Sequence, residues 1–184
     1  MIKELETKRL RLRGWKDSDT EPFITLNADP EVMRFFEAPL TPQQTCASIE
    51  RIKKHFTVEG FGLFAVEAKA DGKFIGFVGL ARPTFEASFT PCVEIGWRLA
   101  KEYWGQGYAP EAAQRALLFG FEECNLAEIV SMTAAVNKPS IRVMEKIGML
   151  RSDDFMHPKV SDGHKLKPHV LYRIKAPLKR SSAG

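Results

Sequence analysis

The stretch from Trp104 to Glu123 reads WGQGYAPEAAQRALLFGFEE, in which two glycines separated by one residue lead directly into a predicted helix. Gly105 and Gly107 lack a Cβ atom, so they accept unusual backbone angles and let a ligand approach the main chain closely. The first N–H groups of the following helix have no partner within it. Together they predict a concave set of donors at the positive end of a helix dipole, where a phosphate fits. In isolation the same pair also fits a plain tight turn.

The residues around this turn exclude two common phosphate motifs. A P-loop ends in Gly-Lys-Ser/Thr, whereas Gly107 is followed here by Tyr108 and Ala109. A dinucleotide-binding fingerprint has a third glycine at the position of Pro110, and it needs repeated βα units that the first two thirds of the chain lack. Any phosphate held at this turn therefore belongs to another class of ligand.

Hydrophobic periodicity predicts a mixed α/β domain with one central sheet of seven strands and about four flanking helices. Thr41-Pro42 and Asn137 are expected to start two of the helices. The predicted domain covers residues 7–176, and residues 177–184 are expected to form a loose tail. The predicted strands are 7–15, 61–68, 73–82, 92–99, 128–135, 149–156 and 169–176.

Composition limits the classes of protein and partner. The net charge is +4, and no apolar run approaches the roughly 18 residues that a membrane-spanning helix needs. No element typical of nucleic-acid readers accompanies the basic residues, so neither nucleic acid nor membrane is expected as a partner. The charged N-terminus lacks a secretory pattern. Three widely spaced cysteines suit reduced, buried thiols in a cytoplasmic protein.

A longer segment around the turn carries a family resemblance. CVEIGWRLAKEYWGQGYAPEAAQRAL contains Glu94-Ile95-Gly96-Trp97, then the turn, then Glu111-Ala112. It resembles the acetyl-CoA-binding core of the GNAT N-acetyltransferase superfamily, in particular the branch of the ribosomal-protein N-terminal alanine and serine acetyltransferases. Further on, NKPSIRVMEKIGM resembles the next signature of the family, with Met149 in place of the usual Phe. Trp104 stands where many members have Arg or Gln, and Trp is common there in this branch.

The resemblance implies a GNAT-like domain whose seven-stranded sheet is mostly antiparallel. It also implies acetyl-CoA as the acetyl donor and assigns its contacts. Backbone N–H groups of the glycine turn would hold the pyrophosphate. The strand ending at Leu99 would pair with the pantetheine arm, whose amides a main chain reads without special side chains. The cofactor-binding residues implied in this way are Trp97, Arg98, Leu99, Trp104, Gly105, Gln106, Gly107, Tyr108, Ala109, Asn137 and Ser140.

The resemblance also implies catalytic residues for attack by an amine on the thioester. An aliphatic amine is mostly protonated at neutral pH, so a base must accept its proton. Glu94 is the candidate base, because it lies on the strand that would carry the thioester, and the alternatives are a structural ion pair or an exposed strand residue. Ser140, or Tyr108, would act as the acid for the leaving thiolate, and Asn137 matches a position near the sulfur. A strand N–H near Trp97 would stabilise the oxyanion.

The sequence leaves the acceptor open. A protein N-terminus would need an open groove, and a small-molecule amine would need an enclosed acidic pocket. Phe35, Phe36 and the loop 83–91 are expected to wall this pocket. The histidines of the segment 157–169 match no metal-binding spacing, so no metal is expected, and their loop is predicted near the acceptor.

Two further questions concern activity and assembly. A catalytically silent CoA-binding sensor or scaffold is the alternative function, and the presence of Glu94, Asn137 and Ser140 argues against it. The resemblance is compatible with a monomer or a homodimer and does not choose between them.

Overall fold

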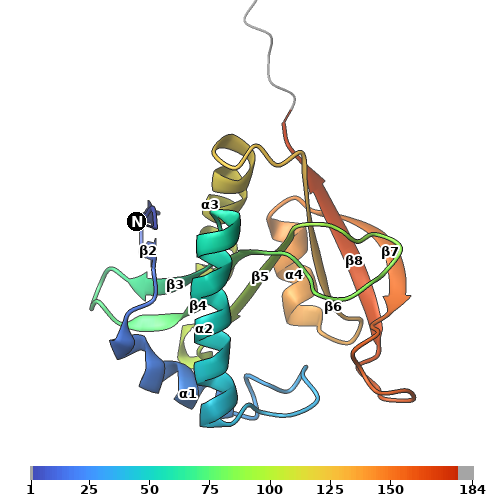
Figure 1. The fold of residues 1–184 in the computed structure, drawn as a ribbon, viewed down its shortest axis with the longest axis horizontal. Coiled ribbons are helices and arrows are strands. Elements are labelled where there is room, and N and C mark those ends of the chain that lie inside the picture. Colours follow the sequence, from blue (N-terminus) through green and yellow to red (C-terminus); the bar gives the residue numbers. More distant parts are fainter. Residues whose placement is uncertain (1, 178–184) are drawn as a thin grey trace, which may run out of the picture.

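Eight strands form one sheet in the order β1-β2-β3-β4-β5-β6-β8-β7 in the computed structural model, which describes residues 2–177 (Figure 1). Neighbouring strands are antiparallel except β5 and β6, which are parallel. The parallel pair divides the sheet into two antiparallel halves. The strands are β1 (Leu5–Glu6), β2 (Leu10–Arg13), β3 (Leu63–Ala68), β4 (Phe74–Ala81), β5 (Glu94–Leu99), β6 (Glu128–Ala134), β7 (Leu150–Met156) and β8 (Pro168–Lys175).

Local sequence signals set the starts of two helices, which confirms the predictions for Thr41 and Asn137. The Thr41 side chain accepts a hydrogen bond from the N–H of Gln44 at the start of α2. The Asn137 side chain accepts one from the N–H of Ser140 at the start of α4. The helices are α1 (Thr20–Ala28), α2 (Pro42–Glu59), α3 (Tyr108–Glu122) and α4 (Lys138–Lys146), with short 3-10 turns η1 (Asp17–Asp19) and η2 (Lys101–Tyr103).

The predicted fold class is confirmed, but the prediction of seven strands is wrong by one. The additional strand is β1, in which Leu5 lies opposite Leu12 of β2. A strand of two residues cannot show the alternation from which strands are predicted. The sheet therefore starts before residue 7, where the domain was expected to begin. Apart from Pro177, the predicted tail lies outside the described residues.

Aromatic contacts show that α1 and α3 cover opposite faces of the sheet. Phe64 of β3 packs against Phe119 of α3, with 5.6 Å between the ring centroids. Phe64 pairs with Val78 of β4, so the preceding residue, Phe77, points to the other face. There it packs against Phe23 of α1 at 5.9 Å. Each face of the sheet is thus buried beneath a helix.

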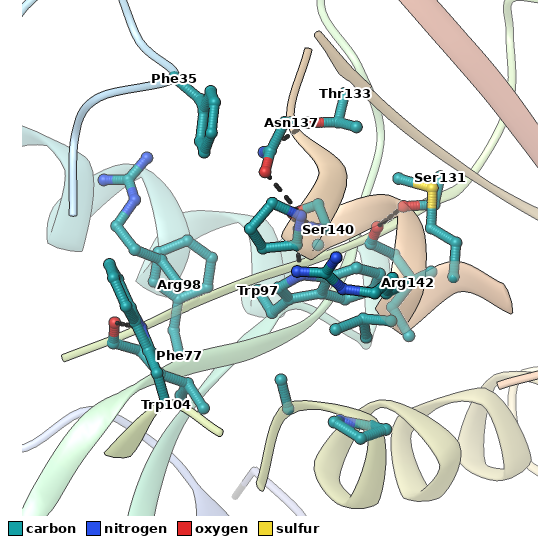
Figure 2. Close-up of a pocket in the computed structure, with 18 of the residues that line it drawn as sticks. Phe35, Phe77, Trp97, Arg98, Trp104, Ser131, Thr133, Asn137, Ser140 and Arg142 are labelled. Carbon is teal, nitrogen blue, oxygen red and sulfur yellow. Dashed lines mark hydrogen bonds between the residues drawn. The ribbon is translucent and has the colours of Figure 1, made fainter. Parts of the chain in front are cut away.

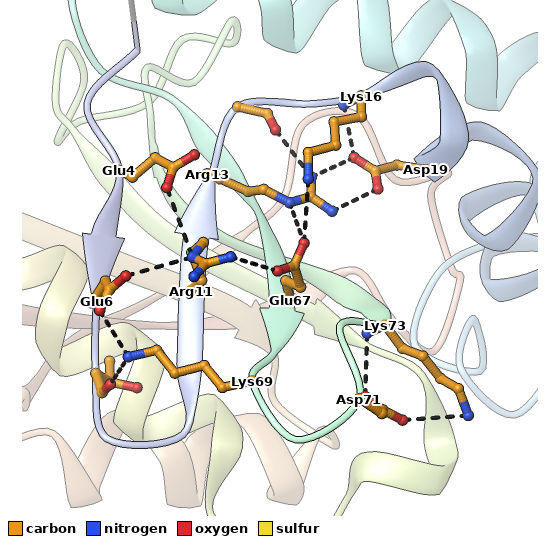
Figure 3. Close-up of polar contacts among 12 residues, drawn as sticks. Glu4, Glu6, Arg11, Arg13, Lys16, Asp19, Glu67, Lys69, Asp71 and Lys73 are labelled. Atoms are coloured by element: carbon orange, nitrogen blue, oxygen red, sulfur yellow. Dashed lines mark hydrogen bonds and ion pairs between the residues drawn. The ribbon is translucent and has the colours of Figure 1, made fainter.

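A buried ion cluster joins the first strands to the turn before α1 (Figure 3). Arg13 of β2 donates to both carboxylate oxygens of Asp19, at 2.7 and 2.9 Å, and to Glu67 of β3, at 2.7 Å. Arg11 donates to the second oxygen of Glu67 at 3.0 Å. The hydrogen bond from Arg13, followed by its charge, lowers the pKa of the Glu67 carboxyl, although burial opposes the shift. The cluster holds β2, β3 and η1 together.

Among residues 2–177, no helix is long and apolar enough to cross a membrane.

The cysteines are free thiols, but the expectation that they are buried is wrong for Cys46, which is exposed on α2. Cys92 is half-buried, and burial raises the pKa of its thiol to about 11.

Candidate active site

Strands β5 and β6 separate immediately after they meet. Within the described chain their one ladder pair joins Glu94 to Val130. One residue further, the Ser131 hydroxyl donates to the carbonyl of Ile95 across 2.9 Å and ends the contact. Because β4 pairs with β5 along all of its length, the opposite edge of β5 from Gly96 onward is left with backbone groups free for a ligand.

The glycine turn lies at the far end of the same strand, after η2. Gly105 and Gly107 have φ angles of 74° and 80°, in the left-handed region that favours glycine. Gly107 is the N-cap of α3 and has no side chain with which to cap the first N–H groups. A Cβ atom at Gly105 would meet nothing within 4 Å, and one at Gly107 would meet only Arg9, at 3.5 Å. The turn therefore presents uncapped donors to open space.

A hydrogen-bond network from the connection between β1 and β2 supports the start of α3. Glu111, in the first turn of α3, accepts hydrogen bonds from the Thr7 hydroxyl at 2.6 Å and from the backbone N–H of Arg9 at 3.0 Å. Its second oxygen accepts from Nε of Arg9 at 2.7 Å. A carboxylate near the N-terminus of a helix also interacts favourably with the positive end of the helix dipole. Glu111 thus fixes the helix on which the turn depends.

Glu94 lies at the point where β5 leaves β6. Its side chain shares one face of the strand with Arg98, since residues separated by an even number point the same way. Burial raises the pKa of the Glu94 carboxyl to about 7, and the charge of Lys159 opposes this shift weakly. No ion pair is formed by Glu94 within residues 2–177, which removes the structural ion pair as its role. A carboxylate of this kind accepts a proton near neutral pH.

Asn137, Ser140 and Trp97 form a connected group on the other face of β5 (Figure 2). The Asn137 amide donates to Thr133 at 2.8 Å while its oxygen caps α4 through the N–H of Ser140 at 3.3 Å. The indole N–H of Trp97 donates to the Ser140 hydroxyl at 3.3 Å. The Ser140 hydroxyl accepts here, so its own proton is free for another group. Asn137 therefore is an N-cap and also lies at the site.

Trp104 is not a core aromatic residue. Its ring is 39% exposed, and its indole N–H donates to the carbonyl of Leu99 at 2.8 Å. The guanidinium of Arg34 lies 5.2 Å above the ring. Trp104 thus lies between the end of β5 and the glycine turn and connects the two.

A cavity of about 590 Å³ joins these parts. It is lined by every residue predicted for catalysis or cofactor binding except Gln106, whose side-chain amide turns back to the carbonyl of Glu102 at 2.8 Å. The predicted site residues along its wall are Glu94, Trp97, Arg98, Leu99, Trp104, Gly105, Gly107, Tyr108, Ala109, Asn137 and Ser140.

The expectations for the acceptor side are met in part. Phe35 and Phe36 line the cavity, and Phe36 is 47% exposed and hence not a core residue. The segment 83–91 does not line it; this segment reaches across to β7, where Phe85 packs against His157 at 4.7 Å (Figure 1). His157 in turn lies 4.7 Å from His169, and burial lowers the pKa of His157 to about 4. These histidines are neutral members of an aromatic cluster outside the cavity.

Sequence reasoning missed several basic residues of the cavity. Arg34 comes from the connection before α2, and Arg142 and Lys146 come from α4. Carboxylates are fewer along the wall, where Glu94 is accompanied by Glu31. Arg34 belongs to no motif. Arg142 and Lys146 lie within the second family signature, but no role was predicted for them there, and only the excess of Lys and Arg in the composition hints at a basic wall. The lining is therefore basic rather than acidic.

Comparisons with known proteins agree with this arrangement. The family model described as "Acetyltransferase (GNAT) domain" matches residues 9–150. The FsC-acetyl coenzyme A-N(2)-transacetylase of Aspergillus fumigatus is 35% identical over 160 residues, which cover 83% of this chain and 67% of that protein.

Solved structures show the same architecture. An acetyltransferase (GNAT family) from Bacillus anthracis superposes with a TM-score of 0.76 at 28% identity, covering 94% of this chain and 98% of the other. The ribosomal-protein-S5-alanine acetyltransferase of Vibrio fischeri superposes with a TM-score of 0.71 at 19% identity, covering 97% and 99%, which shows a shared fold. With the family model matched over most of its length, this chain belongs to the GNAT acetyltransferase family.

Proposed function

We propose that this protein transfers an acetyl group from acetyl-CoA to a primary amine of a small molecule, by direct attack in a ternary complex. The observation that carries the proposal is the placement of Glu94 at one end of the open edge of β5 and of the glycine turn at the other. A cosubstrate that spans this edge would bring its phosphates to the turn and its reactive end to the carboxylate.

Each step of the transfer has a group suited to it. Glu94 accepts the proton that the acceptor ammonium must lose before its nitrogen can attack, and its pKa of about 7 suits this task near neutral pH. The neutral amine nitrogen then bonds to the acetyl carbon and gives a tetrahedral intermediate, whose oxyanion is stabilised by backbone N–H groups at the open edge of β5, near Trp97. Collapse of this intermediate breaks the bond from carbon to sulfur, and the nitrogen loses its second proton to solvent. The Ser140 hydroxyl, which accepts from Trp97, donates its proton to the leaving thiolate and regains one from solvent.

A bridge between two loops favours a small acceptor. Glu37, between α1 and α2, accepts hydrogen bonds from the Ser161 hydroxyl at 2.8 Å and from its N–H at 3.2 Å. Two residues earlier, Lys159 acts electrostatically on Glu94, so this segment passes close to the base. The hydrogen bonds between Glu37 and Ser161 narrow the opening through which a protein N-terminus would have to reach Glu94. The name of the Aspergillus relative also specifies acetyl coenzyme A as donor and a defined nitrogen as acceptor.

The test has two stages. Calorimetric titration with acetyl-CoA, beside ATP and NADH, should give micromolar binding for acetyl-CoA alone. Thiol release should then be followed with a panel of small amines and with peptides that have a free N-terminus. Turnover confined to small amines is the expected result. Turnover confined to peptides would reverse the assignment of the acceptor, and binding with no turnover on either set would favour the silent CoA-binding alternative.

A further inference from the structure

Arg98 is a cation in the cavity wall that has no anionic partner among the described residues. Its Nη1 donates to the side-chain oxygen of Asn27, a neutral acceptor, at 2.6 Å. Its Nε is buried without any acceptor. Since burying a charge is costly unless the charge is paired, the guanidinium is incompletely satisfied by the protein itself.

Aromatic rings fix the position of this guanidinium. Its central carbon lies 4.3 Å from the ring centroid of Phe36 and 5.4 Å from that of Phe77. Asn27 is itself held, because its amide donates to Thr45 at 3.2 Å, and it is fully buried. The side chain is therefore preorganised towards the cavity that Phe36 and Phe77 also line. Figure 2 shows it on the side of Phe35, across the cavity from Asn137.

The charge of the rest of the lining is consistent with an anionic ligand beyond the phosphates. Glu31, one of the two carboxylates on the wall, is already paired with Lys101 at 3.3 Å. Glu94 is the other, and it lies on the same strand face as Arg98 but four residues away, about 13 Å between Cα atoms. An amine that reaches Glu94 can thus carry a second group that reaches Arg98.

We propose, on the basis of the proposed transferase function, that Arg98 binds a carboxylate of the acceptor and selects amines that carry a negative charge several bonds from the reacting nitrogen. A guanidinium presents a planar fork that matches a carboxylate. The interaction positions the amine at Glu94 and excludes neutral amines by leaving the guanidinium unpaired. Arg98 is a specificity residue in this scheme and takes no part in proton transfer.

Matched acceptors test the proposal. 5-Aminopentanoate is compared with 5-amino-1-pentanol, and 6-aminohexanoate with 6-amino-1-hexanol, by thiol release from acetyl-CoA. In the wild type, kcat/KM should be at least tenfold higher for one of the charged members than for its neutral partner. Arg98→Gln should reduce that ratio to about one, because kcat/KM should fall further for the charged amine than for the neutral amine. Arg98→Lys, which keeps the charge without the fork, should retain part of the ratio, and Arg51→Gln on the exposed side of α2 should retain all of it.

A second readout does not depend on turnover. Glutarate, compared with sodium chloride at equal ionic strength, should raise the melting temperature of the wild type and not that of Arg98→Gln. Equal kcat/KM values for charged and neutral amines in the wild type would overturn the proposal, and so would an equal loss of kcat/KM for both in Arg98→Gln. Either result would leave the transferase function standing. Stabilisation by glutarate that depends on Arg98, together with no transfer to any amine, would instead retain the anion site and remove the proposed function.

Discussion

Nη1 of Arg9, in the connection between β1 and β2, donates a hydrogen bond across 2.9 Å to the carbonyl oxygen of Gln106, the residue between the two glycines of the turn. The same guanidinium lies 4.3 Å above the ring of Tyr108, the first residue of α3. Glycines give this turn wide conformational freedom, and Arg9 restricts that freedom from a position nearly a hundred residues earlier in the chain. The turn is therefore built jointly by two distant parts of the chain.

Replacing Arg9 should weaken binding of acetyl-CoA. Arg9→Met removes the hydrogen bond to Gln106 and a positive charge beside the proposed phosphate site, so we expect Kd to rise about tenfold, in line with the loss of one or two charge-assisted hydrogen bonds. Calorimetry measures this directly. The neighbouring exposed Lys8 provides the control, since Lys8→Met should leave Kd unchanged. Equal affinities in the two variants would show that the turn keeps its shape without Arg9.

A methyl group at Gly107 should affect binding more than folding. Gly107 and Gly72 both have left-handed backbones, with φ of 80° and 69°. Alanine at either position should therefore lower the free energy of unfolding by about 1–2 kcal/mol. Only Gly107→Ala places its Cβ in the space proposed for the phosphate, so only this variant should lose acetyl-CoA affinity, by at least tenfold. Thermal denaturation and calorimetry on both variants separate the two effects, and a comparable loss of affinity in Gly72→Ala would refute the assignment.

The base should make turnover depend on pH. Because the pKa of Glu94 is raised to about 7, its proton-accepting form is lost as pH falls through that value, and kcat/KM should decrease about tenfold per unit below it. Glu94→Gln should lower kcat/KM at pH 8 by about 10²- to 10⁴-fold and abolish this dependence. Any slope that comes from protonation of the acceptor itself adds to the slope from Glu94 in the wild type and is the only slope left in Glu94→Gln. Glu86→Gln, at an exposed position, is the control; an unchanged pH profile in Glu94→Gln would exclude Glu94 as the base.

The raised pKa of the Glu94 carboxyl should also lower the free energy of unfolding at high pH. Between its ordinary pKa of 4.5 and its folded value of about 7, the unfolded state releases the proton while the folded state retains it. The free energy of unfolding therefore falls as pH rises through this window. Relative to the wild type, Glu94→Gln should gain about 3 kcal/mol between pH 4 and pH 8, at about 1.4 kcal/mol per unit. Denaturant unfolding at the two pH values measures the difference, and no change in the relative stability would contradict the buried environment of Glu94.

The cluster around Glu67 should show the opposite dependence on pH. Arg13 lowers the pKa of Glu67, so the stability contributed by this carboxylate is present above pH 4.5 and is lost as pH falls through its folded value. Glu67→Gln leaves Arg13 buried with a weakened partner and should destabilise the protein by about 3 kcal/mol at pH 7. The deficit should shrink in acid. Glu50→Gln, which alters an exposed pair on α2, should cost less than about 0.5 kcal/mol in the same unfolding experiment.

Local signals account for the parts of the fold that were predicted correctly. The caps at Thr41 and Asn137 and the turn at Gly105 and Gly107 depend on residues within a few positions of one another, so their chemistry is legible in the sequence. The two family signatures then place Glu94 beside the same cavity. Strand β1 was missed because it exists through its pairing with β2 and has too few residues for a pattern of its own.

Long-range contacts account for what the sequence could not show. Arg9 reaches Gln106 across 97 positions, and Arg98 reaches Asn27 across 71. No spacing rule links such pairs, because the fold alone brings them together. The acidic acceptor pocket considered for a small amine was likewise not found: the cations Arg34, Arg98 and Arg142 come from three separate elements that converge on one cavity.

The single ladder pair between β5 and β6 gives the sheet a mechanical joint. The two antiparallel halves are joined along this line at Glu94 and Val130, with the Ser131 hydroxyl beside them, so few hydrogen bonds between strands oppose a rotation of one half against the other. Rotation about such a joint would widen or narrow the gap beyond it while leaving Glu94, at the pivot, nearly stationary with respect to both halves. A long, thin molecule would then enter and leave without displacing the carboxylate that we propose as the base.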